Sequence, residues 1–487
     1  MDLIDHRYRR TLPTVTHPPG RQTREHLGAG QSRPETYTRA HPWPPFRFRE
    51  NLTVTIDSRP ANPERRPTAT INPSSPAAND GQIKSELRVL IILSALMSFA
   101  SVSTDMYLPA LPAITRALHA APGSIELTFS AFLVGFSLGQ LLWGPISDRV
   151  GRRGPLAAGL FLFTIGSVGC ALSTSVMQMM IWRVIQALGA CVGPVLARAM
   201  VRDLYGHEHS ARILSMLILI MGVAPLIGPL LGGQILTLWS WRAIFWVLAA
   251  VGIATWVALS ALPESLPASR RSTVPLRHTF KSYWELLGDA RLMGYAMAGG
   301  FFYAGAYAFI VGTPQVYITY YHVSPQAYGW LFGLNIVGMM AANFVNRRLL
   351  KHFKSEELFR MGTWILAIAG VVLLIDAYRG LGGLTGLVVP IFVFMSMNGL
   401  IVANSVADAL SHFPHKAGTA SSLLGALHYG SGILTATLLS RLSDGTPWPM
   451  ALIMALTGLG CLVANAVASR IHARNSRFEV ARNAQPE

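Results

Sequence analysis

Apolar stretches of about 20 residues alternate with short polar breaks along the sequence from Val89 onward. About 20 residues is the length that a helix needs to cross the hydrocarbon core of a membrane. The pattern therefore predicts an all-α membrane protein with twelve transmembrane helices. The approximate limits of the predicted spans are 89–109, 126–146, 155–175, 178–200, 212–237, 242–262, 293–316, 327–345, 361–377, 382–404, 418–439 and 449–469.

The composition supports a membrane protein and argues against a nucleic-acid partner. Only 13% of the 487 residues are charged and the mean hydropathy is +0.38, which is too apolar for an ordinary soluble chain. The formal net charge is +16, but the positive residues lie in loops and tails and not on a basic face interleaved with aromatic residues. Cys170, Cys191 and Cys461 lie in apolar runs without CxxC spacing, so we expect packing residues and no disulfide or metal site.

Two polar segments divide the chain. Residues 1–83 are rich in Pro, Arg, Thr and Asn and have no hydrophobic period, so we expect a disordered cytoplasmic tail. We favour a dispensable extension or the product of an over-long gene model, since no Met lies between Met1 and Met97, over the alternative of a functional tail. The longest polar interruption, 264–290, separates six spans from six. We therefore predict an N-terminal six-helix bundle at 84–263, a cytoplasmic linker at 264–290, a C-terminal six-helix bundle at 291–470 and a second cytoplasmic tail at 471–487.

The charges of the loops predict the orientation. If the first span leaves the cytoplasm, the cytoplasmic loops carry 16 Lys or Arg and the opposite loops carry four. This difference is the positive-inside bias, which places both termini in the cytoplasm. The counted residues are Arg149, Arg152, Arg153, Arg202, Arg212, Arg270, Arg271, Arg277, Lys281, Arg291, Arg347, Arg348, Lys351, Lys354, Arg360 and Lys416 on the cytoplasmic side, and Arg116, Arg242, Arg379 and Arg441 on the other.

The sequence GPISDRVGRRGPL, residues 144–156, concentrates charge in the predicted turn between spans two and three. Gly144 favours close approach of a neighbouring helix, and Gly151 permits a sharp turn. The three arginines of this turn suffice for the topology. Asp148 adds little to the topology, so we expect it to pair with a neighbouring arginine or with the positive N-terminus of a facing helix.

Several motifs resemble those of one transporter family. Gly144, Asp148, Arg149, Gly151, Arg152 and Arg153 resemble the signature loop of the major facilitator superfamily. RVIQALGA (183–190) resembles the second motif of that family, and GVAPLIGPLLGG (222–233) resembles the motif associated with drug:proton antiporters. STDMYLPALP (103–112), ARAMVRDLY (197–205) and WRAIFW (241–246) resemble the bicyclomycin-resistance (Bcr/CflA) subfamily of multidrug exporters. The resemblance covers about residues 88–470 and implies the major facilitator fold, a bacterial inner-membrane location and a monomeric protein.

The antiporter-like segment also has a direct physical interpretation. Its glycines remove side chains from the helix surface, which allows a facing helix to pack closely, and its prolines bend the helix. Close packing together with a bend suits a sealed interface between helices that rock against each other during transport. Ordinary packing of small residues between helices is the alternative. The residues concerned are Gly222, Pro225, Gly228, Pro229, Gly232 and Gly233.

A charge cluster is predicted at the cytoplasmic end of span four. Arg198 and Arg202 are four residues apart and share a helix face, where they repel each other unless an anion lies between them. Asp203, Asp148 or a lipid phosphate could supply that anion. We expect the loop arginines and Asp203 to form an ion-pair cluster that holds one conformation closed on the cytoplasmic side. The corresponding loop of the second half has Asn346 where a matching acid would stand, so an equivalent latch is doubtful.

Ionisable residues inside spans are costly in hydrocarbon and indicate functional sites. Asp105 in span one is the candidate for coupling substrate to protons, with a structural acid at a helix end as the alternative. Arg183 in span four lines the cavity or anchors the span at the membrane surface. Asp376 and Asp408 are expected to be interfacial.

Weaker candidates for a drug-binding cavity are polar residues that could also form interhelical hydrogen bonds. They are Gln140, Gln186, Tyr303, Tyr307, Asn335, Asn398 and Asn404.

The absence of a Walker-type GxxxxGK[ST] disfavours ATP-driven transport, and no HExxH or catalytic triad indicates an intramembrane hydrolase. We predict a secondary transporter, not an enzyme and without a cofactor, that exports small, largely apolar drugs or related compounds in exchange for protons. Its partners are this substrate, protons and the lipid bilayer. A proton-coupled metabolite or sugar transporter of the same fold and a non-transporting receptor or channel remain alternatives.

Overall fold

The computed structural model describes residues 80–121, 123–205, 207–411, 413 and 416–483, and all regular elements within these ranges are helical. Twelve helical segments of this part of the chain are long and apolar enough to cross a membrane. Six of them precede residue 264 and six follow residue 290. The predicted all-α architecture with twelve spans is therefore confirmed.

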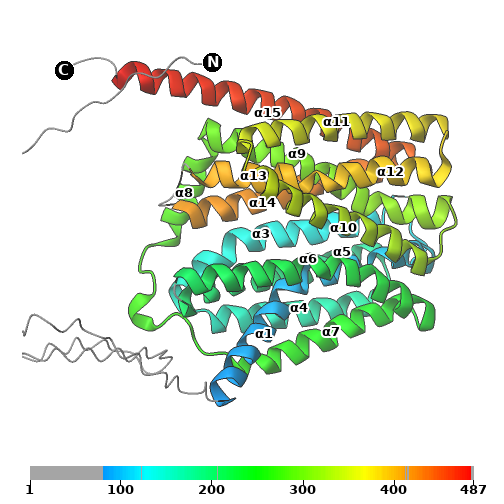
Figure 1. Ribbon diagram of the computed structural model, residues 1–487. Coiled ribbons are helices and arrows are strands. Elements are labelled where there is room, and N and C mark those ends of the chain that lie inside the picture. The colour runs from blue at the N-terminus through cyan, green and yellow to red at the C-terminus, as the bar shows by residue number, and fades with distance from the viewer. Residues whose placement is uncertain (1–79, 122, 206, 412, 414–415, 484–487) are drawn as a thin grey trace, which may run out of the picture. The chain divides into compact units, whose positions relative to one another are not determined.

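The first half of the bundle holds α1 (Asp80–Asp105), η1 (Leu108–Ala110), α2 (Leu111–Ala117), α3 (Glu126–Val150), α4 (Arg153–Leu172), α5 (Val176–Leu204), α6 (His207–Leu238), α7 (Trp241–Ala258) and η2 (Leu259–Ala261). Between the halves lie η3 (Ala268–Arg270) and α8 (Leu276–Leu287). The second half holds α9 (Ala290–Thr313), η4 (Pro314–Tyr320), α10 (Pro325–Leu349), α11 (Ser355–Arg379), α12 (Gly383–Ser396), α13 (Asn398–Ser411), α14 (Ala417–Leu442) and α15 (Trp448–Asn483). Figure 1 shows these helices side by side.

The limits of several elements differ from the prediction; helix α15, for example, continues to Asn483, into the predicted tail at 471–487. Helix α1 begins at Asp80, so residues 80–83 of the predicted tail are helical, while 1–79 lie outside the described residues. The first span continues to Ala117, eight residues beyond its predicted end at 109. The predicted linker contains a 12-residue helix, α8, that the sequence analysis did not identify.

The first span is interrupted because prolines follow the end of α1. Pro109 lies in η1 and Pro112 lies in the first turn of α2. Proline has no backbone N–H to donate to the preceding turn and its ring clashes there, so a regular α-helix cannot continue through these positions. Asp105, the last residue of α1, is therefore placed well inside a span that ends only at Ala117.

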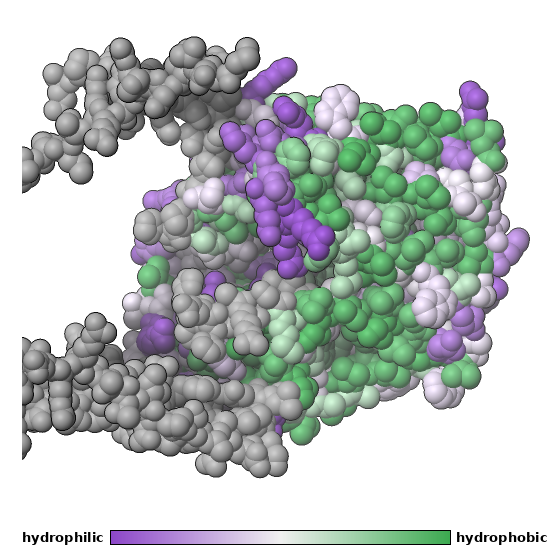
Figure 2. Space-filling model, in the orientation of Figure 1, coloured by the Kyte–Doolittle hydropathy of each residue, from purple (hydrophilic) through white to green (hydrophobic). Residues whose placement is uncertain are grey.

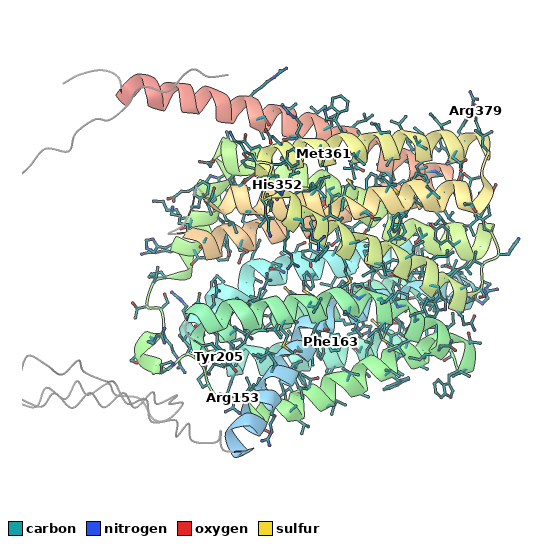
Figure 3. The ribbon with its side chains drawn as sticks, viewed as in Figure 1. Arg153, Phe163, Tyr205, His352, Met361 and Arg379 are labelled. Atoms are coloured by element: carbon teal, nitrogen blue, oxygen red, sulfur yellow. The ribbon has the colours of Figure 1, made fainter. Side chains whose placement is uncertain are left out.

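Helices pack within each half and across the seam between the halves. In the first half, α5 contacts α1, α3 and α4, and in the second half α9 contacts α13, α14 and α15. The halves meet where α3 packs on α14 and where α6 packs on α10. Helices α3 and α5 finish, and α4 and α6 begin, at one end of the bundle, which is called the arginine-rich end. The other end of the bundle is called the opposite end. Figure 3 shows Arg153 and Tyr205 at the first and Arg379 at the second.

Apolar side chains cover much of the outer surface. Large hydrophobic residues such as Trp330 and Val463 are 69% and 62% exposed. Figure 2 shows hydrophobic residues over the middle of the visible face and hydrophilic residues toward both ends. This distribution fits a protein whose middle faces lipid and whose ends face water.

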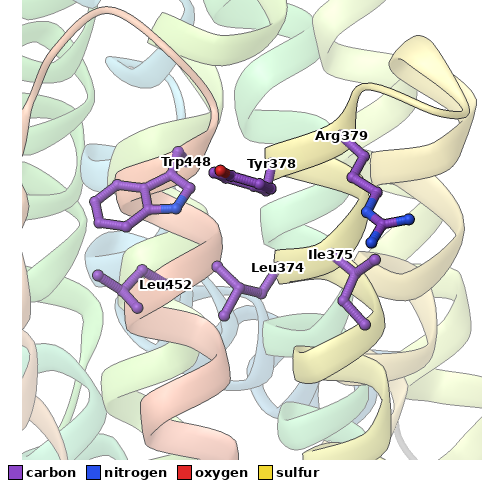
Figure 4. A pocket seen from close by; sticks show the side chains of 6 residues that line it. All are labelled: Leu374, Ile375, Tyr378, Arg379, Trp448 and Leu452. Atoms are coloured by element: carbon purple, nitrogen blue, oxygen red, sulfur yellow. The ribbon is translucent and has the colours of Figure 1, made fainter.

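One groove lies on the second half at the opposite end, between α11 and α15 (Figure 4). Its volume is about 380 Å³, and it is lined by Leu374, Ile375, Tyr378, Arg379, Trp448 and Leu452. None of the predicted site residues lines it.

Glycines of α6 make close contacts with backbone atoms of other helices. A Cβ atom at Gly232 would lie 2.0 Å from the carbonyl oxygen of Met106, and one at Gly233 would lie 2.6 Å from that of Pro325. Gly232 therefore packs α6 on the break in the first span, and Gly233 packs it on α10 of the other half. At Gly222 a Cβ atom would meet nothing within 4 Å, so the expectation of close packing at this residue is wrong.

We expect Gly232→Val to destabilise the protein, because the new side chain collides with the backbone at Met106. Overpacking of this kind costs about 1–3 kcal/mol. Thermal unfolding of the purified protein in detergent measures the effect, with Gly222→Val as a matched control on the same helix. Equal melting temperatures of the two variants would contradict the assigned packing.

Candidate functional site

Arg152 lies between two acids at the arginine-rich end. Its Nη1 atom donates to Asp148 Oδ1 at 2.6 Å, and its Nε atom donates to Asp203 Oδ2 at 2.8 Å. A third hydrogen bond joins Nη1 to Ser147 Oγ at 2.7 Å. The Arg152 side chain is 7% exposed, whereas those of Asp148 and Asp203 are 52% and 13% exposed. Arg152 thus ties the end of α3 to the end of α5 through a largely buried guanidinium.

Glu264 attaches the segment after α7 to the same loop. Its carboxylate accepts hydrogen bonds from the backbone N–H groups of Arg152, Arg153 and Leu266, at 2.8, 3.2 and 3.0 Å. Partial burial opposes ionisation, but these donors and the nearby Arg271 guanidinium together lower the pKa of Glu264 below its ordinary value. Glu264 therefore acts as an ionised clamp on the loop. Sequence reasoning missed it because a single acid at the edge of a polar segment carries no motif.

Two further contacts hold residues 272–274 on the loop. The backbone N–H of Ser272 donates to the carbonyl oxygen of Asp148 at 2.8 Å, and the Arg149 guanidinium donates to the carbonyl oxygen of Val274. The first part of the predicted linker is thus docked on the first half.

The glycines of the loop have different roles. Gly151 has φ +100°, a conformation that other residues rarely adopt, and a Cβ atom there would lie 2.8 Å from Glu264 Oε2. At Gly144 a Cβ atom would meet nothing within 4 Å, so the expected close approach at Gly144 is wrong. Gly151, and not Gly144, is the glycine that the loop geometry requires.

The structure does not bring all predicted members of the charge cluster together. Arg198 donates through Nε to the carbonyl oxygen of Pro194 at 2.7 Å, one turn earlier on its own helix. The Arg202 side chain is exposed. Within the described residues, Arg152 is the arginine that pairs with Asp203, and its partners all belong to the first half or to the segment after α7.

Asp105 lies in the interior of the first span, where α1 breaks. It is 6% exposed and accepts a hydrogen bond from Thr104 Oγ1 at 3.0 Å. A Cβ atom at Gly228 would lie 2.8 Å from the Cβ of Asp105, so this acid packs directly on the antiporter-like segment of α6. Asp105 is deeper in the protein than the predicted span limits implied.

Arg183 on α5 is fully buried near the same break. Its Nη1 atom donates to the carbonyl oxygen of Ser103 at 3.2 Å and to Gln186 Oε1 at 2.8 Å. Its guanidinium carbon lies 4.4 Å and 4.3 Å from the ring centres of Tyr107 and Phe132. The interpretation of Arg183 as an anchor at the membrane surface is therefore wrong.

Two N–H groups of Arg183, Nε and Nη2, have no hydrogen-bond partner. Gln186 is itself oriented by Ser167, to whose Oγ it donates at 2.8 Å. On the neighbouring α3, Glu126 is 7% exposed and its Oε2 atom also lacks a partner. A buried guanidinium with unused donors can bind an anion or a carboxylate. Glu126 was missed because it stands at the start of an apolar run.

A cluster of aromatic side chains lies where α3, α9 and α14 meet. Tyr303 stacks on His428 with ring centres 4.7 Å apart, and Tyr429 contacts Phe136 at 4.4 Å. Tyr307 lies 6.1 Å from Tyr303 and 6.3 Å from Tyr429. These five residues are called the seam cluster. They come from both halves of the bundle.

His428 is a buried polar residue of the seam cluster, and its Nε2 atom has no hydrogen-bond partner among the described residues. It is 5% exposed. Gly299 makes room for it, since a Cβ atom there would lie 2.5 Å from Nε2. Sequence analysis identified Tyr303 and Tyr307 but missed His428 and Tyr429. The dipeptide His-Tyr inside an otherwise apolar span was the available signal.

The other polar candidates fall into three places. Gln140 is 5% exposed, and its Oε1 atom lies 3.4 Å from a Cβ position at Gly425 of α14, so it faces the seam. Asn335 donates to the carbonyl oxygen of Leu331 at 2.9 Å, within its own helix. Asn398 is the first residue of α13 and is half-buried.

Asn404 and Asn346 form a reciprocal amide pair between α13 and α10, at 3.1 and 3.2 Å. Asn404 thus makes an interhelical hydrogen bond. Asp376 accepts a hydrogen bond from the backbone N–H of Gly382 at 2.9 Å, and Asp408 accepts one from Ser355 Oγ at 3.1 Å. Both acids stabilise connections between helices.

Comparison with known proteins gives the family. Residues 91–437 match the Major Facilitator Superfamily. The MFS-type transporter YdgK of Bacillus subtilis is 35% identical over 379 residues, which cover 77% of this chain and 94% of that protein. A bicyclomycin resistance protein homolog of Haemophilus influenzae is 29% identical over 374 residues, covering 77% and 94%. The xylose transporter XylE from E. coli, in a partially occluded inward-open conformation, has the same fold, with a TM-score of 0.62, 13% identity and coverage of 80% and 98%. The chain has the loop at Arg152 and the buried Asp105 and Arg183 described above. It belongs to the major facilitator superfamily of transporters.

Proposed function

We propose that the protein exports small, largely apolar drugs or related compounds across a bacterial inner membrane in exchange for protons. The observation that carries the proposal is the pair of ionisable side chains, Asp105 and Arg183, which are buried near the break in the first span and have no ion-pair partner among the described residues. The name of the H. influenzae relative, a bicyclomycin resistance protein homolog, supports a drug as substrate.

Asp105 is the group that takes up and releases the proton. An ionised carboxylate in hydrocarbon is costly, so Asp105 is stable as the neutral acid or with a cation beside it. It packs on Gly228 of α6, the helix that also contacts α10 of the second half through Gly233. A movement of α6 between the two orientations of the transporter therefore changes the surroundings of Asp105 directly.

Arg183 completes the coupling site. Its unused Nε and Nη2 donors favour a carboxylate or an anionic group near the break. Because Arg183 already holds the Ser103 carbonyl, a change in its partners is transmitted to the end of α1, two residues from Asp105.

The seam cluster is the proposed substrate site. Its rings offer a large apolar surface with few fixed polar contacts, as an adaptable small-molecule site requires. Its position between α3, α9 and α14 means that separation of the halves opens it. The imidazole of His428 and the hydroxyl groups of Tyr303, Tyr307 and Tyr429 are the polar groups that this site contributes.

The arginine-rich end faces the cytoplasm in this proposal, with both termini on that side. Arg152 and its two acids hold α3, α5 and the segment after α7 as one unit. This unit is the proposed latch. Unlike the cluster predicted from the sequence, it joins parts of the first half and the segment after α7 to each other, so it must remain intact while the two halves rock.

The first test concerns coupling. In proteoliposomes with an imposed pH gradient, we expect Asp105→Asn to abolish gradient-driven drug accumulation and to retain exchange of neutral compounds, because only the titrating group is lost. Asp376→Asn is the matched control, since the asparagine oxygen can still accept the hydrogen bond from Gly382. If Asp105→Asn responds fully to the gradient, Asp105 is structural. If the wild-type protein transports no drug under any gradient, the exporter proposal fails.

The second test concerns the substrate site. His428→Phe retains the stacked ring but removes the nitrogen atoms, so we expect KM for the transported drug to rise while kcat is kept. One lost neutral hydrogen bond is worth about 0.5–1.5 kcal/mol, which corresponds to roughly a 2- to 10-fold change. His352→Phe is the control, because His352 lies outside the spans at the arginine-rich end. An unchanged KM for a panel of drugs in His428→Phe would exclude the histidine from the site.

The third test separates the two acids of the latch. Asp203→Asn should lower the free energy of unfolding by about 1–3 kcal/mol, since it weakens a charged hydrogen bond to a buried guanidinium. Asp148 is half exposed and solvent screens its ion pair, so Asp148→Asn should cost about 0–1 kcal/mol. Both variants should insert into the membrane and transport poorly. Normal transport by both at equal expression would remove the latch from the mechanism.

A further inference from the structure

Helix α8 presents three different faces. With about 100° between successive residues, Tyr283 and Leu286 lie on one side, and they are 6% and 2% exposed. The hydroxyl of Tyr283 donates to the carbonyl oxygen of Leu141 on α3 at 3.3 Å. This face therefore docks on the helix bundle.

A second face is apolar and exposed. Phe280, Trp284 and Leu287 are spaced by four and three residues, so they form one stripe along the helix. Their exposed fractions are 48%, 79% and 37%. A continuous apolar stripe of this kind is unfavourable in water and indicates a surface that is covered by a partner or by lipid.

A third face is cationic. Arg277 and Lys281 are exposed and lie next to the apolar stripe, between it and Glu285. Glu285 is the acid of α8, and Lys416 at the start of α14 binds it at 2.8 Å. This ion pair lowers the pKa of Glu285 below its ordinary value. The charge that α8 presents to its surroundings is therefore positive.

The short connection to α9 fixes the height of α8 relative to the membrane. Leu287 ends α8 and Ala290 begins α9, whose membrane-spanning part starts at Leu292. Three steps between Cα atoms cover at most about 11 Å. The apolar stripe is therefore within reach of the membrane surface.

We propose that α8 lies in the headgroup layer of the membrane and binds anionic phospholipids. Phe280, Trp284 and Leu287 insert among the acyl chains, and Arg277 and Lys281 contact the phosphate groups. The docked face remains on the bundle, so the helix lies parallel to the membrane surface. This role is independent of the transported compound and of proton coupling.

Site-directed spin labelling tests the depth of α8. The three native cysteines are fully buried, so single cysteines at exposed positions can be labelled selectively. Labels are placed at Trp284→Cys and Phe280→Cys, with Thr273→Cys as the control in water and Val463→Cys as the control in lipid. In vesicles of phosphatidylcholine and phosphatidylglycerol, we expect the ratio of oxygen to nickel-chelate accessibility at 280 and 284 to exceed that at 273 several-fold and to approach that at 463.

A second arm tests the lipid charge. In vesicles of phosphatidylcholine alone, the accessibility ratio at 284 should fall, and Arg277→Gln/Lys281→Gln should remove the difference between the two vesicle types. A label at 284 as accessible to nickel as the one at 273 in both vesicles would overturn the proposal. Protection at 284 in native membranes but not in vesicles would also overturn it, because the occupant would then be a protein.

Discussion

The hydrocarbon core of the membrane offers no hydrogen bonds. This constraint determines both the helical architecture of the protein and the candidate functional site. Backbone groups are satisfied inside helices, so every span is helical in the described part of the chain. Polar side chains follow the same rule: Ser167 binds its own helix and Gln186, and Asn346 and Asn404 bind each other. Because most buried polar groups are paired, the buried groups that lack a hydrogen-bond partner among the described residues point to functional positions. Arg183, Glu126 and His428 are among them, and all three lie in spans that meet at the first-span break or at the seam.

The sequence predicted the twelve helical spans well because the length of each apolar run is a direct consequence of the thickness of the membrane. The same signal placed the end of the first span at 109, and it did not show that the helix breaks after Asp105 and that the span continues to Ala117. The sequence also predicted that Asp148 pairs with a neighbouring arginine or with the N-terminus of a facing helix, and the structure shows the arginine. It could not predict that Arg152 turns toward both Asp148 and Asp203 while Arg198 binds Pro194, because spacing along a helix says which residues share a face and not which rotamer each one adopts.

The two halves differ in how they hold their helix ends. In the first half, the connection at the arginine-rich end rests on full charges, with Arg152 between two acids. In the second half, α10 and α13 are joined by the neutral amides of Asn346 and Asn404. Charge pairs respond to pH, salt and nearby headgroups, while an amide pair does not. Salt screens the buried pair of Arg152 with Asp203 only weakly, whereas the more exposed contacts of Asp148 with Arg152 and of Glu285 with Lys416 respond to the ionic surroundings.

Docking of residues 264–274 on the loop at Gly151 has a mechanical consequence. Glu264, Ser272 and Val274 are all held by that loop, so the first part of the chain between the halves is not free to extend. The tether that remains consists of α8 and a few residues on either side of it. A tether this short limits how far the halves can separate at the arginine-rich end, and so sets an upper bound on the width of the opening there. Lengthening it would therefore change the size of molecule that can enter without altering any residue that touches that molecule.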